Sequence, residues 1–263
     1  MSTIVISGSA SGIGAATRQA LEAQGHQVIG IDRRGAEVEA DLSNAAGRHH
    51  AVAAVLEHCP QGFDGLVLCA GLGVGVGVGG PASGAGNVVS VNYFGAVELL
   101  DGLLPALRKG QSPAAVVISS TASVHVSWDS CPLSAPLEAG DEATARAIVE
   151  QAPDDGLYLA YAGSKNALTV AVRKRAQAWS DAGVRLNTVA PGATETPLLK
   201  SGLESERYGQ SVADYLPPMG RRARPEEMAS VVQFLLSPAA SYVHATQIYV
   251  DGGSDAATRP TQF

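Results

Sequence analysis

The chain has few charged side chains, few aromatic side chains and few cysteines. Charged residues make up 16% and aromatic residues 5% of its 263 residues, whereas 46% are hydrophobic. Such a composition is typical of a compact globular protein and excludes a disordered one. The length is enough for one large buried core, so we expect a single α/β domain over residues 1–263.

Basic residues are also in deficit. The chain has 18 Lys and Arg against 25 Asp and Glu, for a net charge of −7, which argues against nucleic acid or an anionic membrane as a partner. The N-terminus has no basic residue before Arg18 and only a short apolar run, so it does not resemble a signal peptide. The stretch between Asp64 and Glu98 has no charge, but its glycines and Pro81 argue against a membrane span. We expect a cytoplasmic protein.

The cysteines and histidines show no metal-site pattern. Cys59, Cys69 and Cys131 are odd in number and not at metal-site spacing, so we expect reduced thiols. The six histidines include no H-x-x-x-H pair. We therefore expect no metal.

Short runs rich in Val and Ile alternate with segments that have apolar residues at helical spacing. We expect strands at Thr3–Ser7, Gln27–Ile31, Gly65–Cys69, Ala115–Ser119, Arg185–Val189 and Gln247–Val250, and helices at Ile13–Gln24, Ala45–His58, Val88–Arg108, Leu159–Asp181 and Pro225–Leu236. This alternation predicts βαβ units. The fold class is therefore α/β: a single-domain Rossmann fold, a doubly wound parallel sheet with helices on both faces.

Two glycine-rich stretches compete for a phosphate-binding role. Gly71–Gly86 contains a literal G-x-G-x-x-G at Gly75, Gly77 and Gly80, but we expect no helix to begin within it. Ile6–Ala15 follows a strand and leads directly into a helix, so its backbone N–H groups and the helix dipole can meet a pyrophosphate. We assign the phosphate site to this first loop, with an ordinary tight turn as the alternative. The second stretch is expected to be a loop beside a pocket.

An acidic residue ends the second predicted strand. Asp32 would accept hydrogen bonds from the adenosine ribose and repel a 2′-phosphate, which favours NAD over NADP. Arg33 and Arg34 could bind a 2′-phosphate, but beside Asp32 we interpret them as a solvated turn. The glycines expected to approach the pyrophosphate are Gly8, Gly12 and Gly14.

Tyr161 and Lys165 lie four residues apart on a predicted helix, so their side chains share a face. A phenol, with a pKa of about 10, is a poor base at neutral pH. A nearby ammonium and a positive nicotinamide ring would favour the phenolate and lower this pKa. The pair suits proton transfer at an alcohol oxygen; an incidental surface pair is the alternative.

These motifs, taken in chain order, resemble the short-chain dehydrogenase/reductase family. The resemblance covers the whole chain and rests on the first glycine loop, Asp32, Asp41-Leu42, Cys69-Ala70-Gly71, Asn92, Ser119-Ser120, Tyr161-x-x-x-Lys165 and Pro191-Gly192. It implies an NAD(H)-dependent oxidoreductase that interconverts a secondary alcohol and a ketone. Longer stretches, such as LAYAGSKNALTVAVRKRA, resemble members that act on 3α-hydroxysteroids and reduce other carbonyl compounds.

The resemblance also implies residue roles. Tyr161 would be the acid and base, Ser120 would hydrogen-bond the substrate oxygen, Lys165 would bind the nicotinamide ribose, and Asn92 would hold a water linked to Lys165. Ser119 points to the opposite face of its strand from Ser120, and the family pattern favours Ser120.

Further matches concern the cofactor and the substrate. Asp41 would reach the adenine amine, Leu42 would pack on its ring, and Thr196 would hold the carboxamide. The expected cofactor-binding residues are Gly8, Ser11, Gly12, Ile13, Gly14, Asp32, Asp41, Leu42, Ala70, Gly71, Tyr161, Lys165, Thr194 and Thr196. A substrate lid is expected over residues 194–219, and the expected substrate contacts are Ser120, Tyr161, Pro191, Leu198, Leu199 and Met219.

The chain departs from the family pattern in two places. Cys69 stands where an asparagine is usual. The family places roughly a dozen residues between the catalytic serine and tyrosine, whereas here residues 127–157 form an insertion. We expect one charged amphipathic helix in its stretch EAGDEATARAIVEQA. Such insertions often cover a substrate pocket. We also expect this one to block the dimer contact made by the tyrosine helix in many members, and to direct a different homodimer or a tetramer.

Two other functions remain open at this point. One is a short-chain dehydrogenase acting on a different secondary alcohol or carbonyl. The other is a non-catalytic dinucleotide-binding regulator, which would be expected to lose Tyr161 or Lys165.

Overall fold

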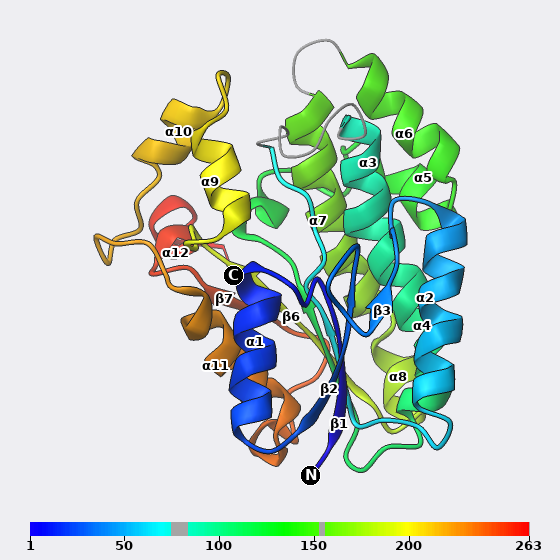
Figure 1. Cartoon of the computed structure of the whole chain (residues 1–263). Helices are drawn as coiled ribbons and strands as arrows, with labels where there is room; N and C mark the ends of the chain where they lie inside the picture. The colour runs from blue at the N-terminus through cyan, green and yellow to red at the C-terminus, as the bar shows by residue number, and fades with distance from the viewer. Residues whose placement is uncertain (75–83, 153–155, 263) are drawn as a thin grey trace.

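Seven parallel strands form one sheet in the computed structural model, which describes residues 1–74, 84–152 and 156–262 (Figure 1). The strands lie in the order β3-β2-β1-β4-β5-β6-β7. Their bounds are Thr3–Ser7 (β1), Gln27–Asp32 (β2), Val38–Glu39 (β3), Gly65–Leu68 (β4), Ala114–Ile118 (β5), Arg185–Pro191 (β6) and Gln247–Val250 (β7). This order confirms the predicted doubly wound sheet.

The strand order changes direction at β1, because β2 and β3 lie on one side of it and β4 to β7 lie on the other. Ile4 pairs with Val28 of β2 on one side and with Gly65 of β4 on the other. In open α/β sheets, the crevice outside the carboxyl ends of the strands at such a reversal is where ligands bind. Ser7 and Asp32 end the two strands on one side of this crevice.

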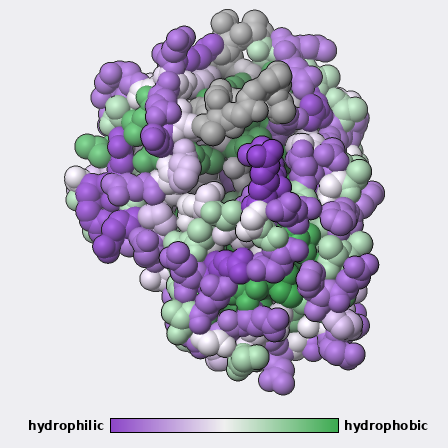
Figure 2. Space-filling model, in the orientation of Figure 1, coloured by the Kyte–Doolittle hydropathy of each residue, from purple (hydrophilic) through white to green (hydrophobic). Residues whose placement is uncertain are grey.

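Helices cover both faces of the sheet (Figure 1). α1 (Gly12–Ala23) and α11 (Pro225–Leu236) pack together on one face. On the other face lie α2 (Ala45–His58), α4 (Gly95–Leu107), α7 (Gly156–Lys174) and α8 (Ala176–Asp181). Two buried hydrophobic clusters, one on each face of the sheet, fill the spaces between these layers. On the side shown in Figure 2, mainly hydrophilic residues cover the surface.

Two predicted helices are interrupted in the structure. The predicted helix Val88–Arg108 is α3 (Ala85–Val89), a π-helical turn η1 (Ser90–Phe94) and then α4. The predicted helix Leu159–Asp181 is α7 followed by α8, with Arg175 between them. The two-residue edge strand β3 was not predicted, because two residues show no periodicity.

Several short helices complete the fold. The insertion forms α5 (Ser134–Ala139) and α6 (Glu142–Gln151) rather than one helix, because Gly140 adopts a left-handed conformation between them. The predicted lid carries α9 (Pro197–Leu203) and α10 (Gly209–Asp214). The remaining short helices are η2 (Thr121–Val124), η3 (Pro238–Ala240) and α12 (Ser254–Thr258).

The second glycine stretch is only partly described. Gly75, Gly77 and Gly80 lie outside the described residues, so the predicted role of this stretch as a pocket-side loop stays a prediction. The expectation that no helix begins within Gly71–Gly86 is wrong at its end, because α3 begins at Ala85. Within the described residues, Ala85–Leu107 is the one helical stretch long and apolar enough to cross a membrane. Most of it is buried inside the fold, as expected for a core helix.

Candidate active site

One large cavity opens at the carboxyl ends of β1, β4, β5 and β6, and the lid segment borders it. Its volume is about 550 Å³. The predicted cofactor-binding residues all line it: Gly8, Ser11, Gly12, Ile13, Gly14, Asp32, Asp41, Leu42, Ala70, Gly71, Tyr161, Lys165, Thr194 and Thr196. The structure therefore brings together residues from the whole length of the chain.

The first glycine loop needs its glycines for two physical reasons. Gly8 and Gly12 have φ of +70° and +53°, in the left-handed region that disfavours other residues. A Cβ on Gly14 would lie 2.0 Å from the carbonyl oxygen of Gly8, so α1 can pack this close only without a side chain there. The side chain of Ser11 does not cap α1, which leaves the helix N-terminus open to a phosphate.

The carboxylate of Asp32 lies beside this loop and is held in place by the backbone. Oδ2 accepts a hydrogen bond from the N–H of Ala10 (3.0 Å), and Oδ1 accepts one from Arg33 (2.7 Å). Arg33 is exposed and lines the cavity mouth. Two fixed hydrogen bonds orient the carboxylate into the crevice.

The turn after β3 forms the far end of the cavity. Oδ1 of Asp41 accepts a hydrogen bond from the backbone of Ser43 (3.0 Å). Leu42 is buried between the cavity and the helices behind it. An apolar side chain beside a carboxylate matches the expected contacts with an adenine ring.

Ser120 and Tyr161 meet at the centre of the cavity. Ser120 follows β5, and its Oγ accepts a hydrogen bond from the N–H of Ala122 (3.1 Å). Ser119 instead contacts Thr169 (Oγ to Oγ1, 2.9 Å) and the Lys165 carbonyl oxygen, away from Tyr161. Burial raises the pKa of Tyr161 above its ordinary value of 10, and a hydrogen bond with Ser120 acts in the opposite direction. The expected lowering of this pKa is absent in the protein alone.

Lys165 is buried and makes its hydrogen bond to the backbone. Its Nζ donates a hydrogen bond to the carbonyl oxygen of Ile118 (2.7 Å) rather than to Tyr161. Burial lowers the pKa of Lys165 to about 8. Burial also raises the pKa of the Cys69 thiol to about 12, against the Lys165 charge. Cys69 is therefore a neutral thiol in the wall of the site.

Asn92 occupies the π-helical turn and does not line the cavity. Its amide Nδ2 donates to the carbonyl oxygen of Leu72 (3.0 Å), and its Oδ1 accepts from the N–H of Leu72 (2.7 Å). The side chain thus clamps the segment that leaves β4. Its Oδ1 and the Nζ of Lys165 both lie close to Gly71.

The predicted lid begins against the glycine loop. The Oγ1 of Thr196 donates to the carbonyl oxygen of Thr194 (3.2 Å) and accepts from the N–H of Leu199 (3.2 Å), which caps α9. The methyl group of Thr196 packs against Gly12. Pro191, Leu198 and Leu199 line the cavity as expected.

The structure places Met219 elsewhere. This residue is 65% exposed and borders a separate, smaller pocket with Pro217 and Met228. The chain after α10 turns away from the cavity and returns toward Gly252, whose carbonyl oxygen accepts a hydrogen bond from the Met219 N–H (3.2 Å). Met219 therefore does not line the cavity, and its expected substrate contact stays a prediction that the pocket does not support.

Sequence reasoning missed His125 and Tyr158 at the substrate end of the cavity, where they lie beside Tyr208 of the expected lid. The Nδ1 of His125 lies 2.5 Å from the hydroxyl of Tyr158, and Tyr158 stacks on Tyr208 at a centroid distance of 6.5 Å. All three line the cavity. Tyr158 precedes Tyr161 by three residues, so helical spacing could have revealed it. No sequence signal marks His125.

No cluster of three or more His, Cys, Asp or Glu side chains that could hold a metal ion occurs among the residues that the structure describes. The insertion also lies outside the cavity wall: none of its described residues lines the cavity. Its helices α5 and α6 pack on α7, and α6 also packs on α3.

The chain belongs to the short-chain dehydrogenase family. Residues 2–135 match the family model described as short chain dehydrogenase, and residues 153–255 match the model described as enoyl-(acyl carrier protein) reductase. These matches confirm the family resemblance.

Two curated relatives cover nearly the whole chain. One is the 3-alpha-hydroxysteroid dehydrogenase/carbonyl reductase of Comamonas testosteroni, which is 68% identical over 263 residues and 100% of both chains. Another is the coniferyl-alcohol dehydrogenase of a Pseudomonas strain, which is 30% identical over 95% of both chains.

One solved structure also matches the chain over its whole length. The 3-alpha-hydroxysteroid dehydrogenase from Pseudomonas sp. B-0831, complexed with NADH, is 49% identical over 100% of both chains, with a TM-score of 0.94.

Proposed function

We propose that this chain is an NAD-dependent oxidoreductase that interconverts 3α-hydroxysteroids and 3-ketosteroids and reduces other apolar carbonyl compounds. The observation that best supports the proposal is one cavity that is lined by Ser120, Tyr161, Lys165, Asp32 and the glycine loop. The full-length likeness to the Comamonas testosteroni enzyme points to the steroid substrate.

The residues present fit NAD. The left-handed Gly8 and Gly12 and the uncapped N-terminus of α1 form a cradle for a pyrophosphate. The oriented Asp32 carboxylate favours a ribose with free hydroxyls. Leu42 and Asp41 would receive the adenine ring, and Thr194 and Thr196 would hold the nicotinamide end.

Tyr161 moves the proton. In alcohol oxidation its phenolate oxygen would take the hydroxyl proton as the carbonyl double bond forms; in ketone reduction its hydroxyl would give that proton back. NAD, when bound, supplies the acceptor for the hydride that leaves the carbinol carbon. Because burial raises the pKa of Tyr161, the protein alone holds the phenol form at neutral pH, which is the form that reduction needs.

Ser120 and Lys165 set the electrostatics around that proton transfer. Ser120, hydrogen-bonded to Tyr161, would donate to the substrate oxygen as charge develops on it. Lys165 would hold ribose hydroxyls and bring a positive charge under the tyrosine, which favours the phenolate. Burial lowers its pKa to about 8, toward neutral pH.

The substrate end of the cavity suits a bulky apolar molecule. Leu198, Leu199 and Tyr208 of the lid line it together with Tyr158 and His125. An apolar wall with few polar groups binds an extended hydrocarbon skeleton by burying it. The aromatic side chains of Tyr158, Tyr208 and His125 also suit aromatic ketones. This favours carbonyl reduction as a second activity of the same site.

Initial rates of NADH formation test the steroid assignment. We expect turnover of androsterone with NAD, little turnover of its 3β-epimer, and little turnover with NADP. Tight NADH binding without turnover of either epimer would refute the steroid reading and leave a short-chain dehydrogenase for another alcohol. A regulator without catalysis would turn over no alcohol at all.

We further propose a cytoplasmic homodimer or tetramer whose interface avoids α7. In support, α5 and α6 pack against α7, the helix that carries Tyr161. Light scattering would give the mass of the assembly, and cross-linking would map its contact. A cross-link between the α7 helices of two subunits would contradict this interface.

A further inference from the structure

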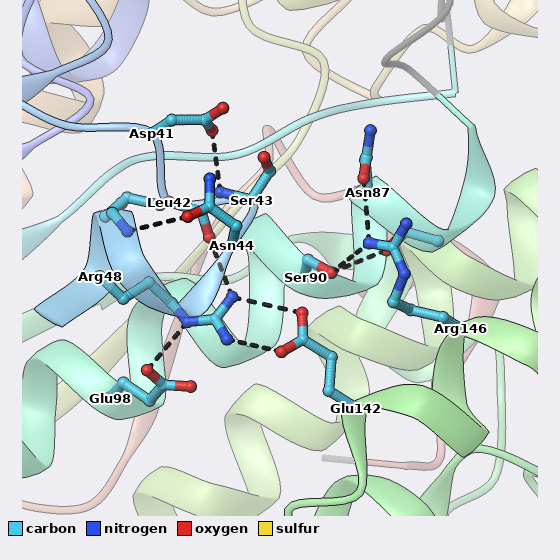
Figure 3. Close-up of polar contacts among 12 residues, drawn as sticks. Asp41, Leu42, Ser43, Asn44, Arg48, Asn87, Ser90, Glu98, Glu142 and Arg146 are labelled. Atoms are coloured by element: carbon cyan, nitrogen blue, oxygen red, sulfur yellow. Dashed lines mark hydrogen bonds and ion pairs between the residues drawn. The ribbon is translucent and has the colours of Figure 1, made fainter.

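The insertion does not line the cavity, but it contacts residues that line its cofactor half. Helix α6 carries Glu142 and Arg146, one helical turn apart, and both point into the fold toward residues around the adenine end of the cavity (Figure 3). Neither residue lines the cavity itself. They act on residues that do.

The first connection is a buried ion cluster. Arg48 of α2 is 1% exposed. Its Nη2 donates to Oε2 of Glu142 (2.5 Å) and its Nη1 to Oε1 (3.2 Å), while its Nε lies 2.9 Å from Oε2 of Glu98. Burial acts to lower the pKa of Arg48, but the two carboxylates outweigh it and raise that pKa. The guanidinium therefore stays charged and oriented between α2, α4 and α6.

The same guanidinium also holds the wall of the cavity. Nη1 of Arg48 donates a hydrogen bond to the carbonyl oxygen of Leu42 (3.2 Å). Leu42 and its neighbours Asp41 and Ser43 line the cavity. Glu142 thus fixes a guanidinium that in turn fixes the turn expected to receive the adenine ring (Figure 3).

The second connection runs to α3. Nη1 of Arg146 donates to Oδ1 of Asn87 (2.9 Å) and to Oγ of Ser90 (2.7 Å). Asn87 lines the cavity. Helix α6 therefore holds two separate cavity-lining segments, the Asp41–Ser43 turn and the start of α3.

We propose that helix α6 of the insertion is a positioning element for the cofactor, in which Glu142 acts through Arg48 on the Leu42 carbonyl and so sets the affinity for NAD. The inference rests on the proposed NAD-dependent activity. Removing Glu142 leaves Arg48 with one carboxylate partner, so the guanidinium loses its fixed orientation and the turn loses its anchor. Nucleotide affinity falls while the residues around Tyr161 keep their geometry.

The test compares Glu142→Ala with Glu138→Ala. Both residues belong to the insertion, but Glu138 lies on α5 and forms an exposed ion pair with Lys174 of α7 instead of pairing with Arg48. Coupling through such networks is about 0.5–2 kcal/mol, so Glu142→Ala should raise the NADH dissociation constant and the KM for NAD about two- to thirtyfold. At saturating NAD, kcat and the KM for the alcohol should stay at the wild-type values. Glu138→Ala should change none of these constants.

ADP-ribose serves as a probe of the adenine half alone. Glu142→Ala should weaken ADP-ribose binding by the same factor as NADH binding, and Glu142→Gln, which keeps one acceptor for Arg48, should restore part of the affinity. A merely structural role would lower kcat through loss of active protein and leave KM for NAD unchanged.

A second variant removes the buried guanidinium itself. The double variant Arg48→Met/Glu142→Leu removes Arg48 together with one of its two carboxylate partners. Glu98, whose side chain is 32% exposed, keeps its charge, so the fold should recover part of its stability. The Leu42 carbonyl still lacks its donor, so NADH binding should stay weak.

The outcomes separate the two proposals. Wild-type NADH affinity in Glu142→Ala and in the double variant would overturn the positioning role. A wild-type protein that binds no NADH would instead refute the proposed function.

Discussion

Replacing Gly14 by alanine should break the phosphate loop. The new Cβ would lie 2.0 Å from the Gly8 carbonyl oxygen, 2.8 Å from its carbonyl carbon and 3.3 Å from the Cβ of Cys69. The two nearest are backbone atoms, and Gly8 is itself tied to β2, because its N–H donates to the Ile31 carbonyl oxygen (2.8 Å). The loop and the start of α1 must therefore separate by more than about 1 Å to restore an ordinary contact.

This displacement has two measurable consequences. Overpacking of this kind costs about 1–3 kcal/mol, which in a chain of this size lowers Tm by about 2–12 °C. A shift of about 1 Å at a ligand-positioning element costs about a hundredfold, so the NADH dissociation constant should rise by that order in a fluorescence titration. The matched control is Gly25→Ala at the other end of α1: Gly25 has φ of +81° but open space around its Cβ position.

Gly25→Ala should cost stability through the strained backbone and leave NADH binding unchanged. A Gly14→Ala protein that binds NADH within about twofold of the wild type would show that close approach of α1 to Gly8 is not what holds the pyrophosphate.

Three further predictions concern cofactor choice, substrate contact and acid stability. Asp32→Ala should lower the ratio of kcat/KM for NAD over NADP by about 10- to 100-fold, the loss of one or two charge-assisted hydrogen bonds of about 1.5–3 kcal/mol; an unchanged ratio would refute the role of that carboxylate. Tyr208→Ala should raise the steroid KM about tenfold by removing an apolar wall, whereas Met219→Ala should leave it unchanged; the reverse pattern would restore Met219 as a contact. A hydrogen bond from Arg18 lowers the pKa of Glu37 to about 2, below its ordinary 4.5, so this carboxylate stabilises the fold above pH 4.5 and less as pH falls toward 2. Glu37→Gln should reduce the fall in Tm between pH 5 and pH 3, and an unchanged fall would contradict the assignment.

The parts of the site that sequence could predict are those defined by local spacing. A strand that leads through glycines directly into a helix places Gly8, Gly12 and Gly14 at the end of β1 without further information. Helical spacing puts Tyr161 and Lys165 on one face of α7. Alternation along a strand separates Ser119 from Ser120, and the structure places only Ser120 beside Tyr161.

The parts that sequence could not predict depend on contacts between distant segments. Arg48 and Glu142 are 94 residues apart and meet only after the insertion has packed on α3 and α7. The path of the lid after α10, which takes Met219 out of the cavity, depends on its contacts with Gly252. The π-helical turn at Asn92 leaves no trace in the hydrophobic pattern, because the clamp on Leu72 is made by a side-chain amide.

The kinetics of Tyr161→Phe with NAD and androsterone test the central claim most directly. The variant removes only the hydroxyl group that would transfer the proton, so kcat should fall by about 10²- to 10⁴-fold, and the NADH dissociation constant should remain within about twofold of the wild-type value. A Tyr161→Phe protein that oxidises the steroid at the wild-type rate would contradict the account, because the proton would then be transferred by another group.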